Sequence, residues 1–226
     1  MPEATTWTLE SELCAMAGEA PTLAIALDRL GLTSAGGEPE ELRLVEAWRR
    51  GGAETYVYAF AVQTGGSSTT YLLKAFVPYP GTISVADALA RYIHRAEIFR
   101  DAGVRTPRTH AWLKGTLLQE YIPEELSDAI RSGPPQRREA LVISAMTQRM
   151  ATEQLGFAPM QFFSDLRVDG SATVLVDLGQ DLLPCESREY DPDQIVSDWK
   201  TWLWGHLPSE SLREELVRIA RTAVSS

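Results

Sequence analysis

Three strand-like segments separated by glycine-containing turns most constrain the fold of this chain. They cover residues 42–48, 55–62 and 70–77, and the later two are rich in Tyr, Val, Thr and Phe, which favour strands. Residues 50–52 and 65–68 contain paired glycines and connect one segment to the next. Short connections of this kind join antiparallel neighbours. The pattern therefore predicts an antiparallel meander.

Two helices are expected around this meander. Before it, residues 22–32 have apolar positions at helical spacing. After it, Ser84 and Asp87 have the spacing of a capping box, and apolar residues then recur at helical intervals up to Gly103. The sequence thus predicts a short N-terminal helix and one long helix after the third strand.

Two more strands follow the long helix. Residues 109–113 and 116–122 are strand-like, and the Lys114-Gly115 pair between them is typical of a tight turn. Together with the meander they give a five-stranded antiparallel sheet. We expect residues 1–122 to form an N-terminal lobe made of this sheet, the N-terminal helix and the long helix.

Beyond Pro123 the pattern becomes mainly helical, which predicts a second lobe over residues 123–226. The final helix is expected to begin with a capping box formed by Ser211 and Glu214. The overall fold class is then α+β with two lobes, the second a short helical one that contains a β-hairpin. The predicted helices of this lobe cover residues 125–131, 136–155, 191–207 and 212–224.

The predicted hairpin of the second lobe carries an aspartate at each end. Asp165 precedes its first strand, Asp177 follows its second strand, and Asp169-Gly170 supplies the turn. A carboxylate at a strand end, followed by a glycine such as Gly179, is suited to binding a metal ion and phosphate. An ordinary acidic turn is the alternative interpretation.

Composition limits the classes of partner. A net charge of −10 opposes binding to a nucleic-acid backbone. No apolar run reaches the length of a membrane span, and no basic, then apolar leader begins the chain, so we expect a cytoplasmic protein that binds neither nucleic acid nor membrane. Cys14 and Cys185 are far apart and lack nearby ligand-spaced partners, so buried free thiols are expected.

The order of several motifs resembles the protein-kinase-like phosphotransferases, and within them the aminoglycoside phosphotransferase and choline kinase branch. The resemblance covers the chain from about Thr22 onward. It implies a two-lobed kinase-like fold with ATP and magnesium as cofactors. The motifs that carry it are Gly51-Gly52, residues 71–76 (YLLKAF), 103–108 (GVRTPR), 117–123 (LLQEYIP) and 176–179 (VDLG).

The resemblance implies that Lys74 is the strand lysine that holds the ATP phosphates. An ammonium group in an apolar strand needs an anionic partner or solvent, so an exposed strand lysine is the alternative. The helix carboxylate that usually pairs with this lysine would be Glu97. Asp87 competes for this role, and a solvated Glu97 is the other alternative.

The resemblance also implies further nucleotide contacts. Gly51 and Gly52 stand where the family has its phosphate-covering turn, although an ordinary hairpin turn explains two adjacent glycines as well. Backbone groups near Glu120, Tyr121 and Ile122 would hydrogen-bond the adenine edge, as the connector between lobes does in this family.

For the metal site, Asp177 resembles the magnesium ligand of the family's Asp-x-Gly motif. Asp165 takes the position of a metal-binding Asn, and Asp181 is a weaker candidate. The family's catalytic Asp should lie about five residues earlier, but residues 156–163 contain neither an acid nor a histidine. Asp165 is therefore also the candidate catalytic base, whereas Gln161 could only orient a substrate.

Two hypotheses follow from the absence of the family's catalytic Asp. The chain is either an ATP- and magnesium-dependent phosphotransferase acting on a hydroxyl of a small molecule or peptide, or a catalytically inactive pseudokinase that serves as a nucleotide-binding or partner-binding scaffold. A different nucleotide transfer in the same site is a third possibility. A group of acidic residues would suit a cationic acceptor, with a solvated acidic face as the alternative. They are Glu186, Glu189, Asp191, Asp193 and Asp198.

Three tryptophans crowd one predicted terminal helix. Trp199, Trp202 and Trp204 are expected to pack into the helical lobe. Trp202 and Trp204 cannot share one helix face, so one of them is expected to line a pocket or an interface.

Overall fold

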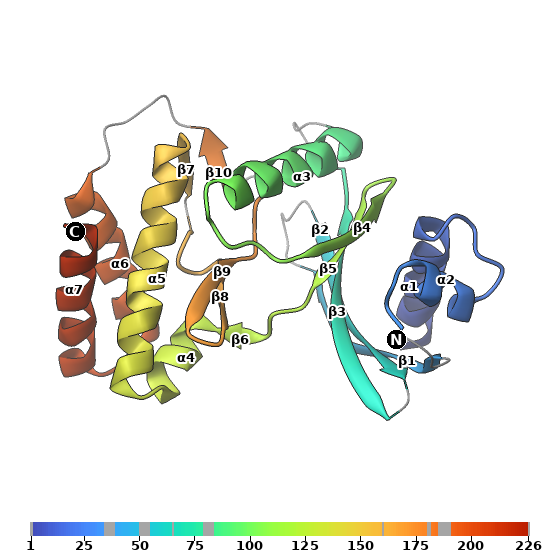
Figure 1. Cartoon of the computed structure of the whole chain (residues 1–226), viewed down its shortest axis with the longest axis horizontal. Helices are drawn as coiled ribbons and strands as arrows, with labels where there is room; N and C mark the ends of the chain where they lie inside the picture. The colour runs from blue at the N-terminus through green and yellow to red at the C-terminus, as the bar shows by residue number, and fades with distance from the viewer. Residues whose placement is uncertain are drawn as a thin grey trace. The chain divides into compact units, whose positions relative to one another are not determined.

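The chain is an α+β protein that divides into two compact units. The computed structural model describes residues 2–33, 39–49, 55–64, 66–78, 84–159, 161–179, 182–184 and 191–225 (Figure 1). The first unit is Met1–Arg91 with Arg108–Tyr121, and the second is Tyr92–Pro107 with Ile122–Ser226. We predicted that residues 92–107 belong to the first lobe. Their contacts instead place them in the second unit.

The first unit is built on the predicted five-stranded antiparallel sheet, which is confirmed. The strand order is β1-β2-β3-β5-β4, so the meander of β1, β2 and β3 is extended by β5 and then β4. β3 is therefore the central strand. The bounds are β1 (Pro39–Arg49), β2 (Thr55–Thr64), β3 (Ser67–Phe76), β4 (Thr109–Leu113) and β5 (Thr116–Glu120).

Two helices at the start of the chain pack beside this sheet (Figure 1). They are α1 (Pro2–Met16), which we did not predict, and α2 (Leu23–Arg29), which we did. Leu9 and Leu13 lie one turn apart on α1 and are buried, in one apolar core with Leu27 of α2 and Phe60 of β2. Burial of this apolar stripe holds α1 against the sheet.

The hairpin that joins β4 to β5 requires unusual backbone angles. Leu113 pairs with Thr116, which leaves a two-residue loop with φ of 48° at Lys114 and 89° at Gly115. Positive φ at both loop positions is typical of a type I′ turn. A Cβ at Gly115 would also collide with Cγ1 of Val85, so only glycine fits.

Helix α3 (Val85–Asp101) begins as predicted. The Ser84 hydroxyl accepts a hydrogen bond from the Asp87 amide at 3.1 Å and donates one to its carboxylate at 2.6 Å. The helix ends before Gly103, where φ is 81°. Its apolar face includes Phe99, which is fully buried and meets the ring of Phe157 edge-on at 5.1 Å.

The second unit is mainly helical. Its longest helix, α5, contributes a buried face that includes Leu141, Val142, Ala145 and Met146. α7 packs against α5 and α6. The helices are α4 (Leu126–Ser132), α5 (Pro135–Gln154), α6 (Pro192–His206) and α7 (Glu210–Val224). The strands form two small sheets: β6 (Glu124–Glu125), β8 (Leu166–Asp169) and β9 (Ala172–Leu175), and β7 (Phe157–Pro159) with β10 (Leu182–Pro184).

The start of α7 differs from the prediction. The N-cap residue is Ser209, whose hydroxyl accepts a hydrogen bond from the Leu212 amide at 3.4 Å, so the expected capping box of Ser211 and Glu214 is wrong by two residues. Pro208 directly precedes the cap. Among the residues described, no helix is long and apolar enough to cross a membrane.

Candidate functional site

The predicted hairpin is present as strands β8 and β9 of the second unit. Leu166 pairs with Leu175 at its base and Asp169 with Ala172 at its tip. The loop residues are therefore Gly170 and Ser171, and Asp169 ends the first strand instead of forming the turn. Gly170 has a φ of 65°, and glycine with positive φ at the first loop position is typical of a type II′ turn.

The two predicted metal-binding aspartates lie on the two backbone segments at the base of this hairpin. Asp165 immediately precedes β8, and Asp177 lies two residues beyond β9. The Val176 amide donates a hydrogen bond to the Asp165 carbonyl at 3.0 Å, which extends the ladder beyond the hairpin. Both aspartates are partly buried. The structure thus places two carboxylate-bearing residues on adjacent backbone segments.

The Asp177 carboxylate has a defined orientation. Its Oδ1 accepts a hydrogen bond from the Gly179 amide at 3.0 Å, which closes a small turn over Leu178. Leu178 is fully buried and anchors this turn in the core. The glycine amide therefore fixes one carboxylate oxygen.

Helix α3 holds the same segment through two buried residues that the sequence analysis did not select. The Tyr92 hydroxyl donates to the Val176 carbonyl at 2.9 Å. The Arg95 guanidinium donates to the carbonyls of Leu178, at 2.9 Å, and Gly179. Arg95 is 4% exposed. An arginine three residues after Tyr92, on the apolar face of a helix, was the available signal.

The opposite end of the hairpin is fixed to α5 by buried polar groups. The Ser144 hydroxyl accepts a hydrogen bond from the Thr173 amide at 2.9 Å. The Gln148 side-chain amide donates to both the carbonyl and the hydroxyl of Thr173. Supports from α3 and α5 make the hairpin a rigid platform for its terminal carboxylates.

The segment before Asp165, in which we expected a catalytic Asp, is instead anchored by two buried aromatic rings. Phe162 and Phe163 are 2% and 4% exposed. The Phe163 ring lies 4.9 Å from that of Trp199, and the Arg149 guanidinium lies 5.6 Å from the Phe162 ring. These rings anchor the segment in an aromatic core. Gln161 is exposed, and its carbonyl accepts a hydrogen bond from the Ser164 amide at 2.9 Å.

Two other predicted site residues lie in the first unit. Lys74 is on the central strand β3, where it pairs with Val57 and Leu117. It is 5% exposed, so the alternative of an exposed strand lysine is wrong. Glu120 ends β5, where its amide donates to the Arg108 carbonyl at 2.9 Å and its carboxylate accepts from the Arg108 amide at 3.2 Å. The Glu120 amide is thus occupied within the sheet.

The remaining predicted nucleotide-binding residues differ in environment. Tyr121 ends the first unit and Ile122 begins the following segment of the second, and both are partly buried. Glu97 is exposed on α3 within the second unit, so its pairing with Lys74 stays a prediction. Gly51, Gly52 and Asp181 lie outside the described residues.

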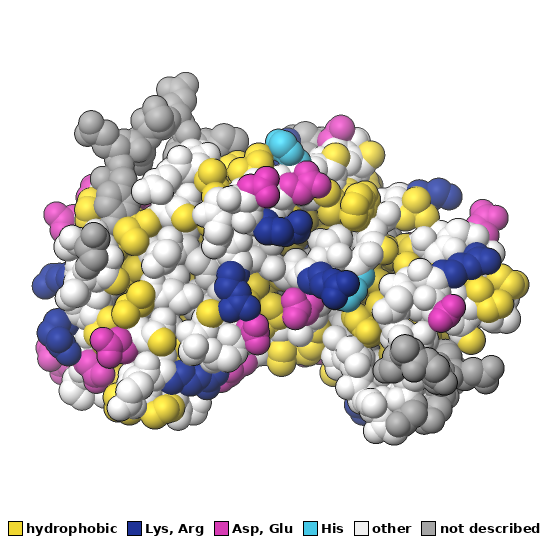
Figure 2. Space-filling model, viewed as in Figure 1, with side chains coloured by type: hydrophobic (Ala, Val, Ile, Leu, Met, Phe, Trp, Pro, Cys, Tyr) yellow, Lys and Arg dark blue, Asp and Glu magenta, His cyan; other side chains and the backbone are white. Residues whose placement is uncertain are grey.

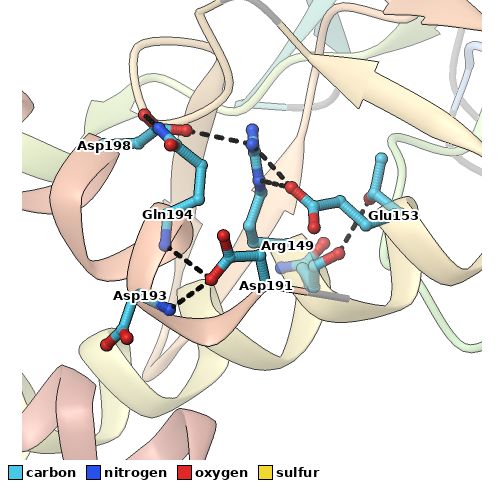
Figure 3. Close-up of polar contacts among 8 residues, drawn as sticks. Arg149, Glu153, Asp191, Asp193, Gln194 and Asp198 are labelled. Atoms are coloured by element: carbon cyan, nitrogen blue, oxygen red, sulfur yellow. Dashed lines mark hydrogen bonds and ion pairs between the residues drawn. The ribbon is translucent and has the colours of Figure 1, made fainter. Parts of the chain in front are cut away.

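Two of the acidic residues expected to bind a cationic acceptor have structural partners (Figure 3). Asp191 caps α6, where its Oδ1 accepts hydrogen bonds from the amides of Asp193 at 3.0 Å and Gln194 at 3.2 Å. Asp198 lies 3.1 Å from the Arg149 guanidinium. Their carboxylates stabilise the second unit. Glu186 and Glu189 lie outside the described residues.

The donor set at the hairpin fits a hard cation only in part. Among the residues described, no group of three or more His, Cys, Asp or Glu side chains is placed to hold a metal ion. Asp165 and Asp177 offer carboxylate oxygens, which Mg²⁺ prefers. Mg²⁺ commonly takes one or two protein carboxylates and completes its shell with water and phosphate oxygens.

The chain matches no protein-family model, and no curated protein matches it significantly. The functional argument therefore depends on the residues and their geometry.

Proposed function

We propose that this chain is an ATP- and magnesium-dependent phosphotransferase of the two-lobed kinase-like fold, acting on a hydroxyl of a small molecule or peptide. One observation carries the proposal: Asp165 and Asp177 flank the base of a rigid hairpin, whose ladder is extended by the hydrogen bond from the Val176 amide to the Asp165 carbonyl. Lys74, buried on the central strand of a five-stranded sheet, supports it independently.

In this proposal each residue has one principal role. Asp177, oriented by the Gly179 amide, is the carboxylate that would hold Mg²⁺. Bound Mg²⁺ would neutralise charge on the phosphates. Lys74 would bind phosphate oxygens through its ammonium group. These residues suit the two ligands, because the hairpin carboxylates offer hard oxygen donors to Mg²⁺ and Lys74 in the sheet offers a cation to the phosphates.

Asp165 is the candidate base. In the transfer, a bond forms between the acceptor hydroxyl oxygen and the terminal phosphorus of ATP, the bond from that phosphorus to the ADP oxygen breaks, and the hydroxyl proton passes to the Asp165 carboxylate. Positioning and charge neutralisation supply most of the rate enhancement in phosphoryl transfer. A single carboxylate near the hairpin base could therefore suffice.

A second candidate function is a nucleotide-binding pseudokinase that acts as a scaffold. The buried rings of Phe162 and Phe163 favour it, because they occupy the segment in which the family has its catalytic acid. Both functions require nucleotide binding.

Nucleotide binding is tested by thermal unfolding of the whole chain in a titration with ATP and Mg²⁺. A ligand that binds only the folded state stabilises it by about 2.7 kcal/mol at a hundredfold excess over Kd. We expect stabilisation of the wild type, and its loss in Asp177→Asn and Lys74→Met. Asp169→Asn is the matched control, because Asp169 lies at the other end of the hairpin and pairs with exposed Arg105.

The absence of stabilisation at millimolar ATP would contradict both nucleotide-binding functions and favour a scaffold that binds only a partner. If nucleotide binds, phosphorus NMR with a panel of hydroxyl-bearing acceptors distinguishes them. Consumption of ATP that depends on an acceptor supports the transferase, and turnover that persists unchanged in Asp165→Ala removes Asp165 from the mechanism. Binding without turnover across the panel supports the scaffold.

A further inference from the structure

A groove of about 410 Å³ lies between α6 and α7 of the second unit, and its lining includes none of the residues of the proposed function. Its walls come from opposite helices of an antiparallel pair. Lys200 and Trp204 of α6 are one turn apart, and the α7 residues recur at helical spacing. The α7 wall contains Glu214, Val217, Arg218 and Arg221.

Trp204 contributes an exposed indole ring to the wall of this groove. On α6, Trp199 is fully buried and Trp202 is 9% exposed, whereas Trp204 is 45% exposed. This confirms that Trp202 and Trp204 do not share one face, and Trp204 is the tryptophan that lines a pocket. Large aromatic side chains left at a surface are typical of interaction sites.

Two cations fix the position of this ring. The Arg213 guanidinium lies 4.6 Å from the Trp204 ring centroid, and the Lys200 ammonium lies 5.3 Å from it. Arg213 also donates hydrogen bonds to the carbonyls of Leu207 at 2.6 Å and Pro208 at 3.2 Å, in the connection between the helices. The indole is thus held in place before any partner binds, which reduces the ordering entropy of binding.

The groove is basic, although the whole chain has a net charge of −10. Both basic and acidic side chains lie at the surface over α7 (Figure 2), whereas the groove itself is lined by Lys200, Arg218 and Arg221 against a single acid. Arg218 and Arg221 are exposed and form no ion pair with any carboxylate in the described part of the chain, and the same holds for Lys200. By contrast, Arg137 and Arg149 of the same unit are each paired. Glu214 is the acidic residue of the groove wall.

We propose that this groove binds an acidic amphipathic helix of another protein. An apolar side chain of the partner packs against Trp204 and Val217, and partner carboxylates pair with Arg218 and Arg221. The two arginines are three residues apart, which is about 4.5 Å of helical rise. Glutamates three or four residues apart on a facing helix present carboxylates at a similar spacing.

The observations favour this partner over other anionic ligands. Small-molecule sites enclose most of the ligand surface, whereas this groove is walled mainly by exposed side chains along two helices, with buried Val217 at its apolar part. An extended polyanion such as single-stranded nucleic acid would be repelled by the remainder of an acidic chain. A short helix with local negative charge contacts the basic groove alone, which is the helix-in-groove mode of recognition.

Fluorescence anisotropy of a labelled probe peptide tests the proposal on the whole chain. The probe is a helical peptide of about 14 residues with Leu on one face and Glu beside it. A second peptide has Gln in place of every Glu. We expect saturable binding of the Glu peptide, and binding of the Gln peptide weaker by about tenfold or more. Equal binding of both peptides would overturn the proposal.

Matched double variants test whether the peptide binds at this groove. Arg218→Ala with Arg221→Ala should weaken binding by about tenfold, because both charged contacts are lost. Arg91→Ala with Arg100→Ala removes the same charge from exposed positions on α3 and should change affinity by less than about twofold. Equal weakening by both pairs would show non-specific attraction and refute the groove.

Trp204→Ala tests the apolar contact separately, and we expect it to weaken the Glu peptide and the Gln peptide by the same factor. Displacement of the probe by a single-stranded oligonucleotide, or self-association that Arg218→Ala abolishes, would assign a different occupant and overturn the proposal. Asp177→Asn should bind the probe like the wild type, since the groove does not depend on nucleotide binding.

Discussion

Arg149 on α5 donates a hydrogen bond to Asp198 on α6 across 3.1 Å, and this pair joins two helices of the second unit (Figure 3). The Arg149 side chain is 6% exposed and also pairs with Glu153 at 2.7 Å. Its guanidinium lies 5.6 Å from the ring of Phe162. One buried cation therefore links both helices to the segment that precedes Asp165.

Arg149→Met should destabilise the second unit by about 2 to 3 kcal/mol, because it leaves two carboxylates without their shared partner. Asp198→Asn should destabilise it by about 1 kcal/mol, since Arg149 keeps Glu153. Urea unfolding followed by tryptophan fluorescence measures both. A larger effect for Asp198→Asn than for Arg149→Met would contradict this account of the pair.

Arg95→Met should loosen the turn that contains Asp177. The variant removes the donors to the carbonyls of Leu178 and Gly179. Hydrogen exchange at the Gly179 amide should accelerate by about tenfold, as expected for the loss of a charged hydrogen bond. Exposed Arg100 on the same helix gives the control, Arg100→Met, which should leave that exchange rate unchanged.

Alanine at two turn glycines should have unequal effects. Gly115→Ala should destabilise the first unit by about 3 kcal/mol, because it combines a positive φ with a collision against Val85. Gly170→Ala meets no atom within 4 Å, so backbone strain alone should cost about 1 kcal/mol. Thermal unfolding measures both, and equal losses would argue against the Val85 contact.

The first unit should lose stability below about pH 6.5. Burial lowers the pKa of His110 from its ordinary 6.5, the positive charge of Arg108 lowers it further, and Glu120 partly opposes this. The folded state thus binds a proton less readily than the unfolded state, so stability is retained above the unfolded pKa and falls as the pH decreases below it.

His110→Gln should flatten that dependence. The His110 ring meets the Tyr71 ring edge-on at 5.2 Å, and glutamine fills part of the same space without titrating. The measurement is the difference in Tm between about pH 7.5 and about pH 5.5 for wild type and variant. An identical pH dependence in both would exclude His110 as its source.

Local signals predicted the elements bounded by strong turns. The strand over residues 109–113 lies between Pro107 and the Lys114-Gly115 turn, and the structure gives the same bounds for β4. The hairpin between Asp165 and Asp177 was predicted for the same reason, although its loop is Gly170-Ser171 and not the predicted Asp169-Gly170. In each case the turn chemistry is encoded within a few residues.

Features that depend on tertiary contacts were missed. Leu9 and Leu13 of α1 are buried only because the sheet is present beside them. Arg95 is buried because the carbonyls of Leu178 and Gly179, some eighty residues later, accept its hydrogen bonds. The α7 cap differed because Ser209 caps the helix without a Glu or Gln three residues later, whereas Ser211 has the capping-box spacing but lies inside the helix.

The burial of Phe162 and Phe163 limits where this segment can accept an acidic side chain. A mutation to Asp at either ring position would place a charge in the aromatic core near Trp199, so it would destabilise the fold. Gln161 and Ser164 are exposed, and an acidic side chain at either position is compatible with folding. Acidic substitutions in this segment are therefore tolerated only at the positions that flank the two rings.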